Sequence, residues 1–403
     1  MKAADFRFAL ISDIQFADVP DKTNATGTQF RRYRGTLDVA HRAVEFFNAH
    51  HSVEPLAFAL HNGDVIDHQA AWDFERDEFR DEQQGMEALK AVMRVLSSSF
   101  TKEWIFTLGN HEMYNFTRAQ LRDGITVEGK RGTPFTFRCA NERGEFYHSF
   151  SPHAKWRVVV LDPYDISVYS RGRGMGLCED AVKLLCENSP SAAEYVKNTP
   201  DVFRTEKMSH FPYFKGLEGR NKRWVPFNGA LSEAQLNWLS SELDDAAKCE
   251  QRVIIFSHLL VHPHTAADGG KTLLWNYEDA LGVLRRSAER GNPVAAVFSG
   301  HQHEGGFHTC EEMGTHFVVM ESPLLAQPVD PEHPEESDAG PYAVVEVSDE
   351  CIRIVGNGAK TTSPLFRDAE HARSCVASSD ARQVSKVRTI AVPSASLNAN
   401  AHM

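Results

Sequence analysis

Short apolar runs alternate along the first hundred residues with segments in which apolar side chains recur every three or four positions. The apolar runs cover residues 6–11, 56–60 and 104–108, and the helical spacing covers residues 34–50 and 73–98. Runs of this length predict buried strands, and the spacing between them predicts amphipathic helices. The resulting β–α–β–α–β order predicts parallel strands that are joined by helical crossovers.

The second half of the chain continues this pattern with a larger share of strand. A capping box formed by Ser232 and Gln235 predicts the start of one helix, and a second helix is expected over residues 276–290 with Asn276 as its N-cap. A short turn separates the last two predicted strands, which indicates that they pair antiparallel. The strands are predicted at residues 156–161, 253–256, 294–298, 317–320, 342–347 and 352–355.

Two stretches differ from the rest of the chain. Residues from about 165 to 226 are rich in Gly, Pro and basic side chains and show few clear periods, so we expect a loop-rich insertion that caps one edge of the fold. Residues 362–403 are rich in Ser, Ala and Asn, so we expect a disordered tail in which only residues 390–392 could pack locally. Residues 1–361 are expected to form one domain.

The composition excludes several classes of protein. The 43 Lys and Arg against 55 Asp and Glu give a net charge of -12, which argues against a protein that tracks a nucleic-acid backbone. No apolar run approaches the roughly 20 residues that cross a bilayer, and no secretory signal is visible. The seven scattered Cys include no C-x-x-C pair and indicate reduced thiols. We therefore expect a cytoplasmic protein, a monomer, with no nucleic-acid or membrane partner.

Polar clusters follow five of the predicted strands. Each cluster alone is weak evidence, since Gly-Asp is usually a turn and a single His is usually structural, but five in this order are hard to attribute to chance. The carboxyl ends of parallel strands meet at one edge of a sheet, so we expect the clusters to form one site. The clusters are Asp13-x-Gln15, Gly63-Asp64-x-x-Asp67, Gly109-Asn110-His111-Glu112, Ser257-His258 and Gly300-His301-x-His303.

The donor types in these clusters favour a metal centre. Carboxylate, amide and imidazole groups suit Mn²⁺, Fe or Zn²⁺, and the clusters contain no thiolate for a soft metal. Two metals about 3.5–4 Å apart need a carboxylate that bridges them. Asp64 is the natural bridge.

The ordered clusters resemble the calcineurin-like, dinuclear metallophosphoesterase superfamily, whose first motif is usually Asp-x-His. Gln15 replaces that His and resembles one branch, the manganese-dependent ADP-ribose/CDP-alcohol diphosphatases. The resemblance covers roughly residues 5–360. Further matching segments are Arg32-Tyr33-Arg34, His111-Glu112-Met113-Tyr114-Asn115-Phe116, Asp162-Pro163-Tyr164-Asp165, Phe227-Asn228-Gly229, Gln235-Leu236-Asn237-Trp238-Leu239, Trp275-Asn276-Tyr277 and His303-Glu304-Gly305-Gly306.

The resemblance implies an α/β fold, in part α+β, in which two packed mixed β-sheets are flanked by helices as an αββα sandwich. It implies two divalent cations, with Mn²⁺ expected and Fe, Zn²⁺ and Mg²⁺ as alternatives. His111 would act as general acid or charge stabiliser beside the leaving oxygen, with Asp67 fixing its ring. The implied ligands of the first cation are Asp13, Gln15, Asp64 and His303, and those of the second are Asp64, Asn110, His258 and His301.

The expected reaction is cleavage of the phosphoanhydride of a nucleoside-diphosphate-linked small molecule, such as ADP-ribose or a CDP-alcohol, by in-line attack of a hydroxide that bridges the two cations. Arg34 and Asn228 are candidate substrate contacts, and a structural role stays open for both. Residues 21–25 lack the aromatics that the branch commonly carries after its first motif, so adenine preference also stays open.

Two alternatives remain. The chain could be another phosphoesterase of this superfamily, acting on a cyclic nucleotide, a phosphomonoester or a phosphoprotein. His68 and Gln69 follow Asp67 where phosphoprotein phosphatases usually have Arg-Gly, which counts against the last of these. The other alternative is a catalytically silent scaffold of the same fold, and the presence of all seven ligand positions and His111 counts against it.

Overall fold

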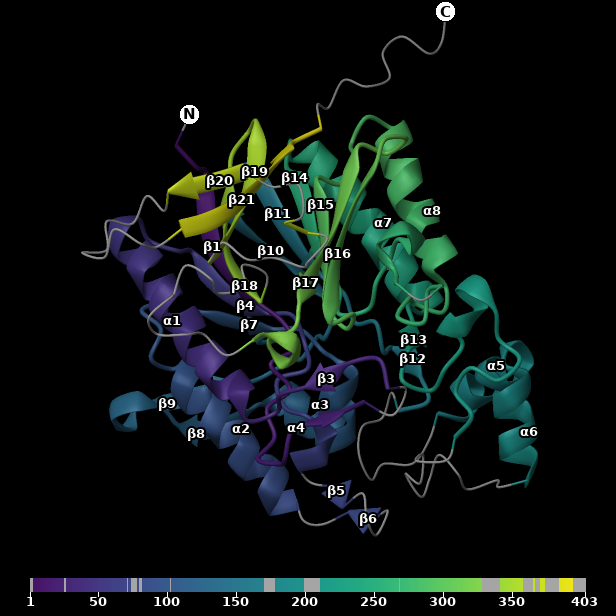
Figure 1. Cartoon of the computed structure of the whole chain (residues 1–403). Helices are drawn as coiled ribbons and strands as arrows, with labels where there is room; N and C mark the ends of the chain where they lie inside the picture. The colour runs from purple at the N-terminus through teal and green to yellow at the C-terminus, as the bar shows by residue number, and fades with distance from the viewer. Residues whose placement is uncertain are drawn as a thin grey trace, which may run out of the picture.

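Two large β-sheets form the centre of the molecule (Figure 1). The computed structural model describes residues 3–24, 27–70, 72–73, 78–79, 82–101, 103–169, 178–198, 211–267, 269–327, 341–357, 365–366, 370–373 and 384–393. One sheet contains β1 (Phe6–Ile11), β4 (Phe58–His61), β7 (Trp104–Phe106), β18 (Tyr342–Val347), β19 (Cys351–Asn357), β20 (Glu370–Arg373) and β21 (Val384–Ala391). Its order is β20-β21-β19-β18-β1-β4-β7, with β1, β4 and β7 parallel as predicted.

The second large sheet has six strands. They are β10 (His148–His153), β11 (Trp156–Val160), β14 (Arg252–Phe256), β15 (Ala296–Ser299), β16 (Glu304–Cys310) and β17 (Thr315–Glu321). Their order is β10-β11-β14-β15-β17-β16, in which the four inner strands are parallel and the two edge strands are antiparallel to their neighbours. Both sheets are therefore mixed, and both direct several strand ends toward the same edge.

Short strand pairs and helices complete the fold. The pairs are β2 (Lys22–Thr23) with β3 (Phe30–Arg31), β5 (Trp72–Asp73) with β6 (Glu78–Phe79), β8 (Ile125–Glu128) with β9 (Pro134–Phe137), and β12 (Ile166–Ser167) with β13 (Gly229–Ala230). The α-helices are α1 (Gly35–Val53), α2 (Glu82–Leu96), α3 (Asn110–Asn115), α4 (Arg118–Asp123), α5 (Glu179–Asn188), α6 (Pro190–Asn198), α7 (Glu233–Lys248) and α8 (Tyr277–Glu289). The 3-10 turns are η1 (His68–Ala70), η2 (Lys130–Gly132), η3 (Gly219–Arg223), η4 (Pro263–Thr265) and η5 (Pro323–Leu325).

Aromatic side chains join the two large sheets face to face. Phe8 of β1 stacks on Phe58 of β4 at 5.0 Å between ring centroids, and it meets the edges of Phe256 and Phe298 in the other sheet at 5.7 and 6.1 Å. The alternation along β1 explains this packing, because successive side chains of a strand point to opposite faces. Phe6, Phe8 and Leu10 belong to the cluster between the sheets, whereas Ala9 and Ile11 pack in the larger cluster on the helix side.

Helices cover the outer faces of both sheets. α1 and α2 lie on one flank of the molecule, and α7 and α8 lie on the opposite flank (Figure 1). α7 begins after Ser232, whose hydroxyl accepts from the backbone N–H of Gln235, as predicted, whereas the side chain of Gln235 bonds the backbone of Asp162 and does not close the capping box. The predicted fold class, two packed mixed sheets flanked by helices, is confirmed.

One predicted helix is shorter than expected. α2 begins at Glu82 and not at residue 73, and the pair β5–β6 takes up residues 72–73 and 78–79. The apolar positions that carried the helical spacing, from Met86 to Leu96, all lie within the observed helix. The preceding residues are mainly charged and continue no apolar stripe, so nothing in them favours a helix packed on the sheet.

The large sheet also extends into the segment that was expected to be a disordered tail. β21 pairs antiparallel with β19, with Ile390 opposite Ile352, and β20 pairs with β21. This corrects the expectation for residues 384–391; most of the remaining tail lies outside the described residues. β21 forms because it pairs with the backbone edge of β19 and buries Val387 and Ile390. These two residues are three positions apart, so they give no alternating pattern that would predict a strand.

The insertion contains more regular structure than its sequence suggested. Its described part includes α5, α6 and η3, where we expected mainly loops. These elements share a hydrophobic cluster that includes Leu185, Phe211 and Trp224, and this cluster reaches Trp275 outside the insertion.

Among the described residues, no helix combines the length and the apolar character that a membrane span requires.

Candidate metal centre

Asp64 lies at the centre of the predicted ligands. Its Oδ2 is 3.2 Å from His258 Nε2 and accepts a hydrogen bond from Gln15 Nε2 at 2.8 Å. Its Oδ1 accepts from the backbone N–H of His111 at 2.9 Å. Asp64 follows β4 of one sheet and His258 follows β14 of the other, so these contacts join the strand ends of both sheets.

Asp13 connects the remaining imidazoles to this centre. Its Oδ1 lies 4.0 Å from His258 Nε2 and 3.8 Å from His303 Nε2. Both carboxylate oxygens of Asp13 are 3.1 Å from the backbone nitrogen of His301, and the hydroxyl of Ser12 donates to Oδ2. His303 Nε2 is also 3.1 Å from Gln15 Nε2. The first motif and the last motif of the chain therefore meet.

Asn110 and His301 complete the set. The ring of His301 lies 5.1 Å from that of His258, and ring nitrogens of both are within 4.8 Å of an Asp64 oxygen. Asn110 is the first residue of α3, and its Oδ1 accepts from the hydroxyl of Tyr164 at 3.3 Å. The structure thus brings all seven predicted ligands to one edge of the two sheets.

Four of the seven hold a backbone conformation that non-glycine residues rarely adopt. Asp13, Gln15, Asp64 and His301 have φ angles of 51°, 43°, 61° and 63°. Among the described non-glycine residues only Glu250 shares this left-handed region. Each such residue costs of order 1–3 kcal/mol, a strain that clusters at functional sites. The strand ends therefore turn sharply in order to aim these side chains at one point.

Two glycines of the motifs are required by close approach. A side chain at Gly63, which has a φ of 87°, would collide with the ring of His258. A side chain at Gly109 would collide with the carboxylate of Asp64. The glycines in Gly63-Asp64 and Gly109-Asn110 therefore make room for the cluster itself.

An unpartnered donor atom indicates that a cation fits this cluster. Gln15 Oε1 is buried and, among the described residues, makes no hydrogen bond. A buried polar atom without a partner costs about 1–3 kcal/mol. A divalent cation held by carboxylate, amide and imidazole donors would offset this cost. The donor set therefore fits the two cations that the sequence predicted.

The electrostatics of the cluster also call for positive charge. Burial raises the pKa of Asp13 to about 7. Burial alone would raise the pKa of Asp64 as well, but the neighbouring His258 and His111 outweigh it and hold the pKa well below its usual range. Burial would lower the pKa of His258, yet the two carboxylates raise it to about 10. A cation bound by the cluster would supply this positive charge in place of the proton on His258.

Hydrogen bonds outside the ligand set fix two of the imidazoles. His258 Nδ1 donates to the backbone carbonyl of Asn62 at 2.7 Å, which leaves its Nε2 to face Asp64. His301 Nε2 lies 3.0 Å from Asn228 Oδ1, which leaves its Nδ1 free. Such bonds set the tautomer and the orientation of ligating histidines. The amide group of Asn228 donates to the carbonyls of Arg223 and Lys271, so both of its hydrogens are used within the protein.

His111 lies next to the cluster, and a backbone N–H group orients its ring. The N–H of His68 donates to His111 Nδ1 at 3.0 Å, so the proton of the neutral ring is on Nε2, which is 3.9 Å from Asp64 Oδ2. We expected Asp67 to fix this ring. Its Oδ2 is 3.7 Å from His111 Nδ1, longer than a hydrogen bond, so the short orienting contact comes from the backbone of His68.

Glu112 is a residue of the motif to which sequence reasoning gave no role. Its carboxylate accepts from the backbone N–H groups of Asp64, Val65 and Gly109 at 2.8, 2.7 and 2.7 Å. It therefore ties the loop after β4 to the start of α3. Burial raises the pKa of Glu112 to about 7 despite these bonds. Its place two residues after Asn110 was the signal that could have revealed it.

Arg34 and Arg31 differ in their position relative to the cluster. Arg34 forms an ion pair with Asp18 at 2.6 Å, with 58% and 81% of the two side chains exposed. No contact within the described part of the chain joins Arg34 to the cluster. Arg31 of β3 has a buried Nε without a hydrogen-bond partner among the described residues. The pKa of His303 is lowered mainly by the burial of its ring and, as the second cause, by the positive charge of Arg31. Arg34 as a substrate contact therefore stays a prediction, and Arg31 is a second candidate in the same basic segment.

The comparisons with known proteins agree with this geometry. The family model described as calcineurin-like phosphoesterase matches residues 6–305. The chain belongs to this family. A crystal structure of a dimetal phosphatase from Danio rerio is similar to it, with a TM-score of 0.70 and 26% identity, covering 97% of this chain and 100% of that one. The chain is therefore a hydrolase of a dinuclear metallophosphoesterase family.

Two relatives carry a more specific name, manganese-dependent ADP-ribose/CDP-alcohol diphosphatase. The one from Oryza sativa subsp. japonica is 31% identical over 325 residues, covering 80% of this chain and 85% of the relative. The one from Homo sapiens is 29% identical over 361 residues, covering 88% and 90%. The similarity extends over most of each chain and agrees with the branch that Gln15 indicated.

Proposed function

We propose that the protein hydrolyses the phosphoanhydride of nucleoside-diphosphate-linked small molecules, such as ADP-ribose or a CDP-alcohol, and releases a nucleoside monophosphate. The observation that carries this proposal is the cluster around Asp64, in which Gln15 occupies the branch-specific ligand position and contacts both Asp64 and His303. The names of the relatives from rice and human support the same substrate class and manganese as the metal.

The seven clustered residues would hold two cations. Asp64 would contribute to both sites, Asp13, Gln15 and His303 would complete one site, and Asn110, His258 and His301 would complete the other. The cations would supply acidification of a water molecule and neutralisation of charge on the phosphoryl oxygens. Asn62 and Asn228 hold the rings of His258 and His301 in place, so Asn228 is proposed as a positioning residue in place of a substrate contact.

His111 would interact with the leaving group. The His68 N–H keeps the ring proton on Nε2, on the side that faces Asp64. An Nε2–H in this place can donate to the oxygen that departs when the phosphoanhydride breaks. Asp67 lies within ion-pair distance of the same ring and would stabilise it if it becomes charged.

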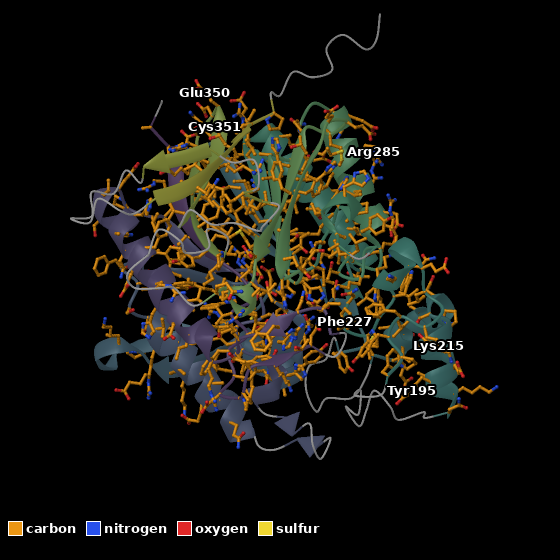
Figure 2. The ribbon with its side chains drawn as sticks, in the orientation of Figure 1. Tyr195, Lys215, Phe227, Arg285, Glu350 and Cys351 are labelled. Carbon is orange, nitrogen blue, oxygen red and sulfur yellow. The ribbon has the colours of Figure 1, made fainter. Side chains whose placement is uncertain are left out.

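Two residues beside the cluster suit a nucleotide. Arg31 places a positive charge close to His303 and can bind a phosphate oxygen. The ring of Phe227 lies 5.7 Å from that of His301 and 5.6 Å from that of Tyr213. Figure 2 shows Phe227 on the inner side of the insertion, with Tyr195 and Lys215 further out. We propose that Phe227 offers the aromatic face on which a nucleobase stacks.

A substrate panel tests the proposed function. With Mn²⁺ we expect release of AMP from ADP-ribose or of CMP from a CDP-alcohol, because the donor set suits two cations that promote hydrolysis of a phosphoanhydride. We expect the activity to vanish with a chelator and to return with Mn²⁺. Chromatography of the products gives the measurement. Cyclic nucleotides, p-nitrophenyl phosphate and a phosphopeptide serve as comparison substrates. Phosphopeptide hydrolysis without cleavage of any pyrophosphate bond would overturn the proposal.

Arg31 offers a test of substrate binding with a matched control. We expect Arg31→Ala to lower kcat/KM for ADP-ribose by about 10- to 150-fold, since a hydrogen bond to a charged group contributes about 1.5–3 kcal/mol. Arg34→Ala should change it less than about fivefold, because its ion pair with Asp18 is exposed. Steady-state kinetics with bound manganese measured in parallel gives the comparison. Equal losses in the two variants would remove Arg31 from the substrate site.

We further propose that the protein acts in the cytoplasm as a monomer on small molecules and not on nucleic acid or membranes. All six cysteines within the described residues are free, which supports a reducing compartment. The acidic total of -12 supports small ligands over nucleic acid. Light scattering after size-exclusion chromatography gives the oligomeric state directly.

A further inference from the structure

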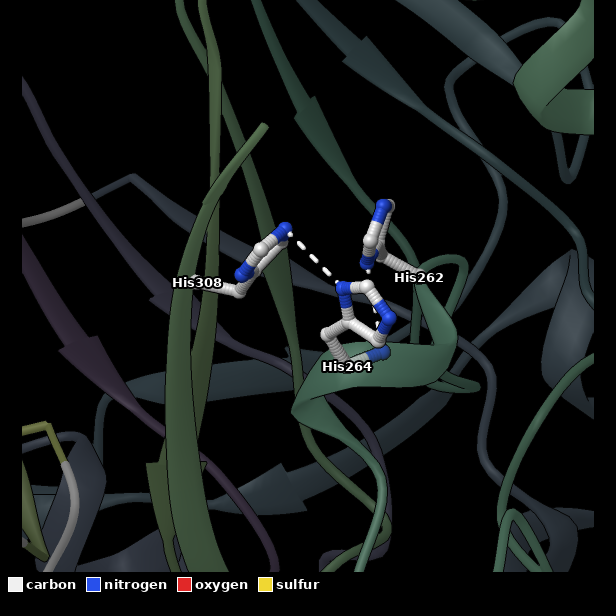
Figure 3. A group of neighbouring side chains, drawn as sticks. All are labelled: His262, His264 and His308. Carbon is white, nitrogen blue, oxygen red and sulfur yellow. Dashed lines mark hydrogen bonds between the residues drawn. The ribbon is translucent and has the colours of Figure 1, made fainter. Parts of the chain in front are cut away.

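Three histidines form a second cluster away from Asp64. His262 precedes η4, His264 lies within η4, and His308 lies on β16, and we call them the histidine triad (Figure 3). A ring nitrogen of each lies within 4.8 Å of a ring nitrogen of the other two. No local pattern predicts the triad, because β16 and η4 are brought together only by the fold.

The spacing of the triad fits coordination by one cation. His264 Nδ1 and His308 Nε2 are 3.4 Å apart. Two nitrogens bound to a tetrahedral Zn²⁺ at about 2.0–2.1 Å lie roughly 3.3 Å from each other, so this pair already has the required separation. His262 is held beside them, since its Nδ1 accepts from the backbone N–H of His264 at 3.2 Å.

The chemical state of the triad also suits a metal. Burial and the neighbouring His308 lower the pKa of His262 to about 3, and burial and His264 lower the pKa of His308. Neutral imidazoles have a lone pair to donate. His264 is exposed, so a cation can enter from solvent.

We propose that the histidine triad binds one divalent cation of borderline softness, with Zn²⁺ as the reference ion and a water molecule as the fourth ligand. Three imidazoles without a carboxylate favour Zn²⁺ over Mn²⁺, whereas the cluster around Asp64 offers the oxygen donors that Mn²⁺ accepts. The cation would compete with the His264 N–H for one lone pair of His262, so we expect weaker binding than at the Asp64 cluster.

A cation in the triad would connect two segments that carry proposed ligands. η4 follows His258, and β16 follows His301 and His303. Gln302 already joins these segments, because its amide donates to the carbonyl of Thr265 at 2.8 Å and its oxygen accepts from Thr272 Oγ1 at 3.3 Å. The triad would add a second link between the same two segments and stabilise them against opening.

The zinc content of the protein tests whether the histidine triad binds a cation. Full-length protein is dialysed against buffered free Zn²⁺, and bound zinc per chain is determined by mass spectrometry. We expect His264→Gln/His308→Gln to hold one equivalent less than the wild type, and to lose part of the rise in Tm that Zn²⁺ causes. His264→Gln alone changes an exposed side chain and gives the same test if the double variant does not fold. His41→Gln, an exposed histidine on α1, serves as the matched control and should behave as the wild type.

Equal zinc content and an equal Tm shift in the wild type, His264→Gln and His41→Gln would overturn the proposal. Loss of one equivalent from the triad variant alone supports it. Neither outcome depends on the substrate of the Asp64 cluster, because metal content and Tm are read without a hydrolysis assay.

Discussion

Replacement of His111 by alanine is expected to lower kcat for ADP-ribose about 10²- to 10⁴-fold while the metal content stays unchanged. The size of the loss is that of a general acid or of a group that stabilises charge on the leaving oxygen. Metal should remain, because His111 Nδ1 accepts from the N–H of His68 and its Nε2 lies 3.9 Å from Asp64 Oδ2, outside the group of donors around Asp64. Steady-state kinetics and metal analysis on the same samples give both quantities.

Two further measurements decide the role of His111. A substrate whose leaving group needs no proton should suffer a smaller loss if the ring acts as general acid, and an equal loss if it only stabilises charge. His41→Ala, the same change at an exposed histidine, should leave kcat within about twofold. Depleted metal in His111→Ala would show instead that His111 is a ligand.

Replacement of Glu112 is expected to give the largest loss of stability at the centre. Glu112→Ala would leave the backbone N–H groups of Asp64, Val65 and Gly109 without their acceptor, which should lower the free energy of unfolding by at least about 3 kcal/mol, since each of the three unsatisfied buried groups costs about 1–3 kcal/mol. Glu112→Gln keeps the shape but places an amide donor against a backbone donor, so it should lose about 1–3 kcal/mol. Urea unfolding in a buffer with Mn²⁺ measures both.

The matched control for Glu112 is Glu87→Ala on α2. Glu87 is exposed and pairs with Lys90 at 2.7 Å, and such a surface pair contributes about 0–1 kcal/mol. Because Glu112 ties the loop of Asp64 to the start of α3, the Glu112 variants should also bind manganese more weakly. Stability of Glu112→Ala equal to that of Glu87→Ala would mean that water satisfies the three N–H groups, and the anchoring role would be lost.

Local pattern was sufficient for much of this fold. Apolar runs located β1, β4 and β7, and the spacing of Leu37, Ala40, Val44 and Phe47 located α1, because side chains of a buried element repeat with its own period. The pattern was insufficient where the buried positions follow no single period. Val387 and Ile390 are three residues apart, so β21 gave no alternating signal although β19 pairs with it along its length.

The residues at the strand ends were likewise visible in the sequence, while their partners were not. Gly63 and Gly109 mark sharp turns, and the donor types after them indicated cations before any contact was known. The roles of Glu112, Asn228 and Arg31 depend on which backbone groups and rings they meet. Those partners lie far away in the sequence, so no local pattern could reveal them.

The sequence by itself determined the order of the elements, the donor set around Asp64 and the family, since each depends on residue types at fixed local spacings. Only the tertiary structure decided that Arg34 pairs with Asp18, that Asn228 contacts His301, and that His262 and His264 meet His308. These outcomes follow from how two sheets pack through Phe8 and Phe256 and bring distant loops to one edge. Such contacts arise between segments whose separation along the chain contains no information about their distance in space.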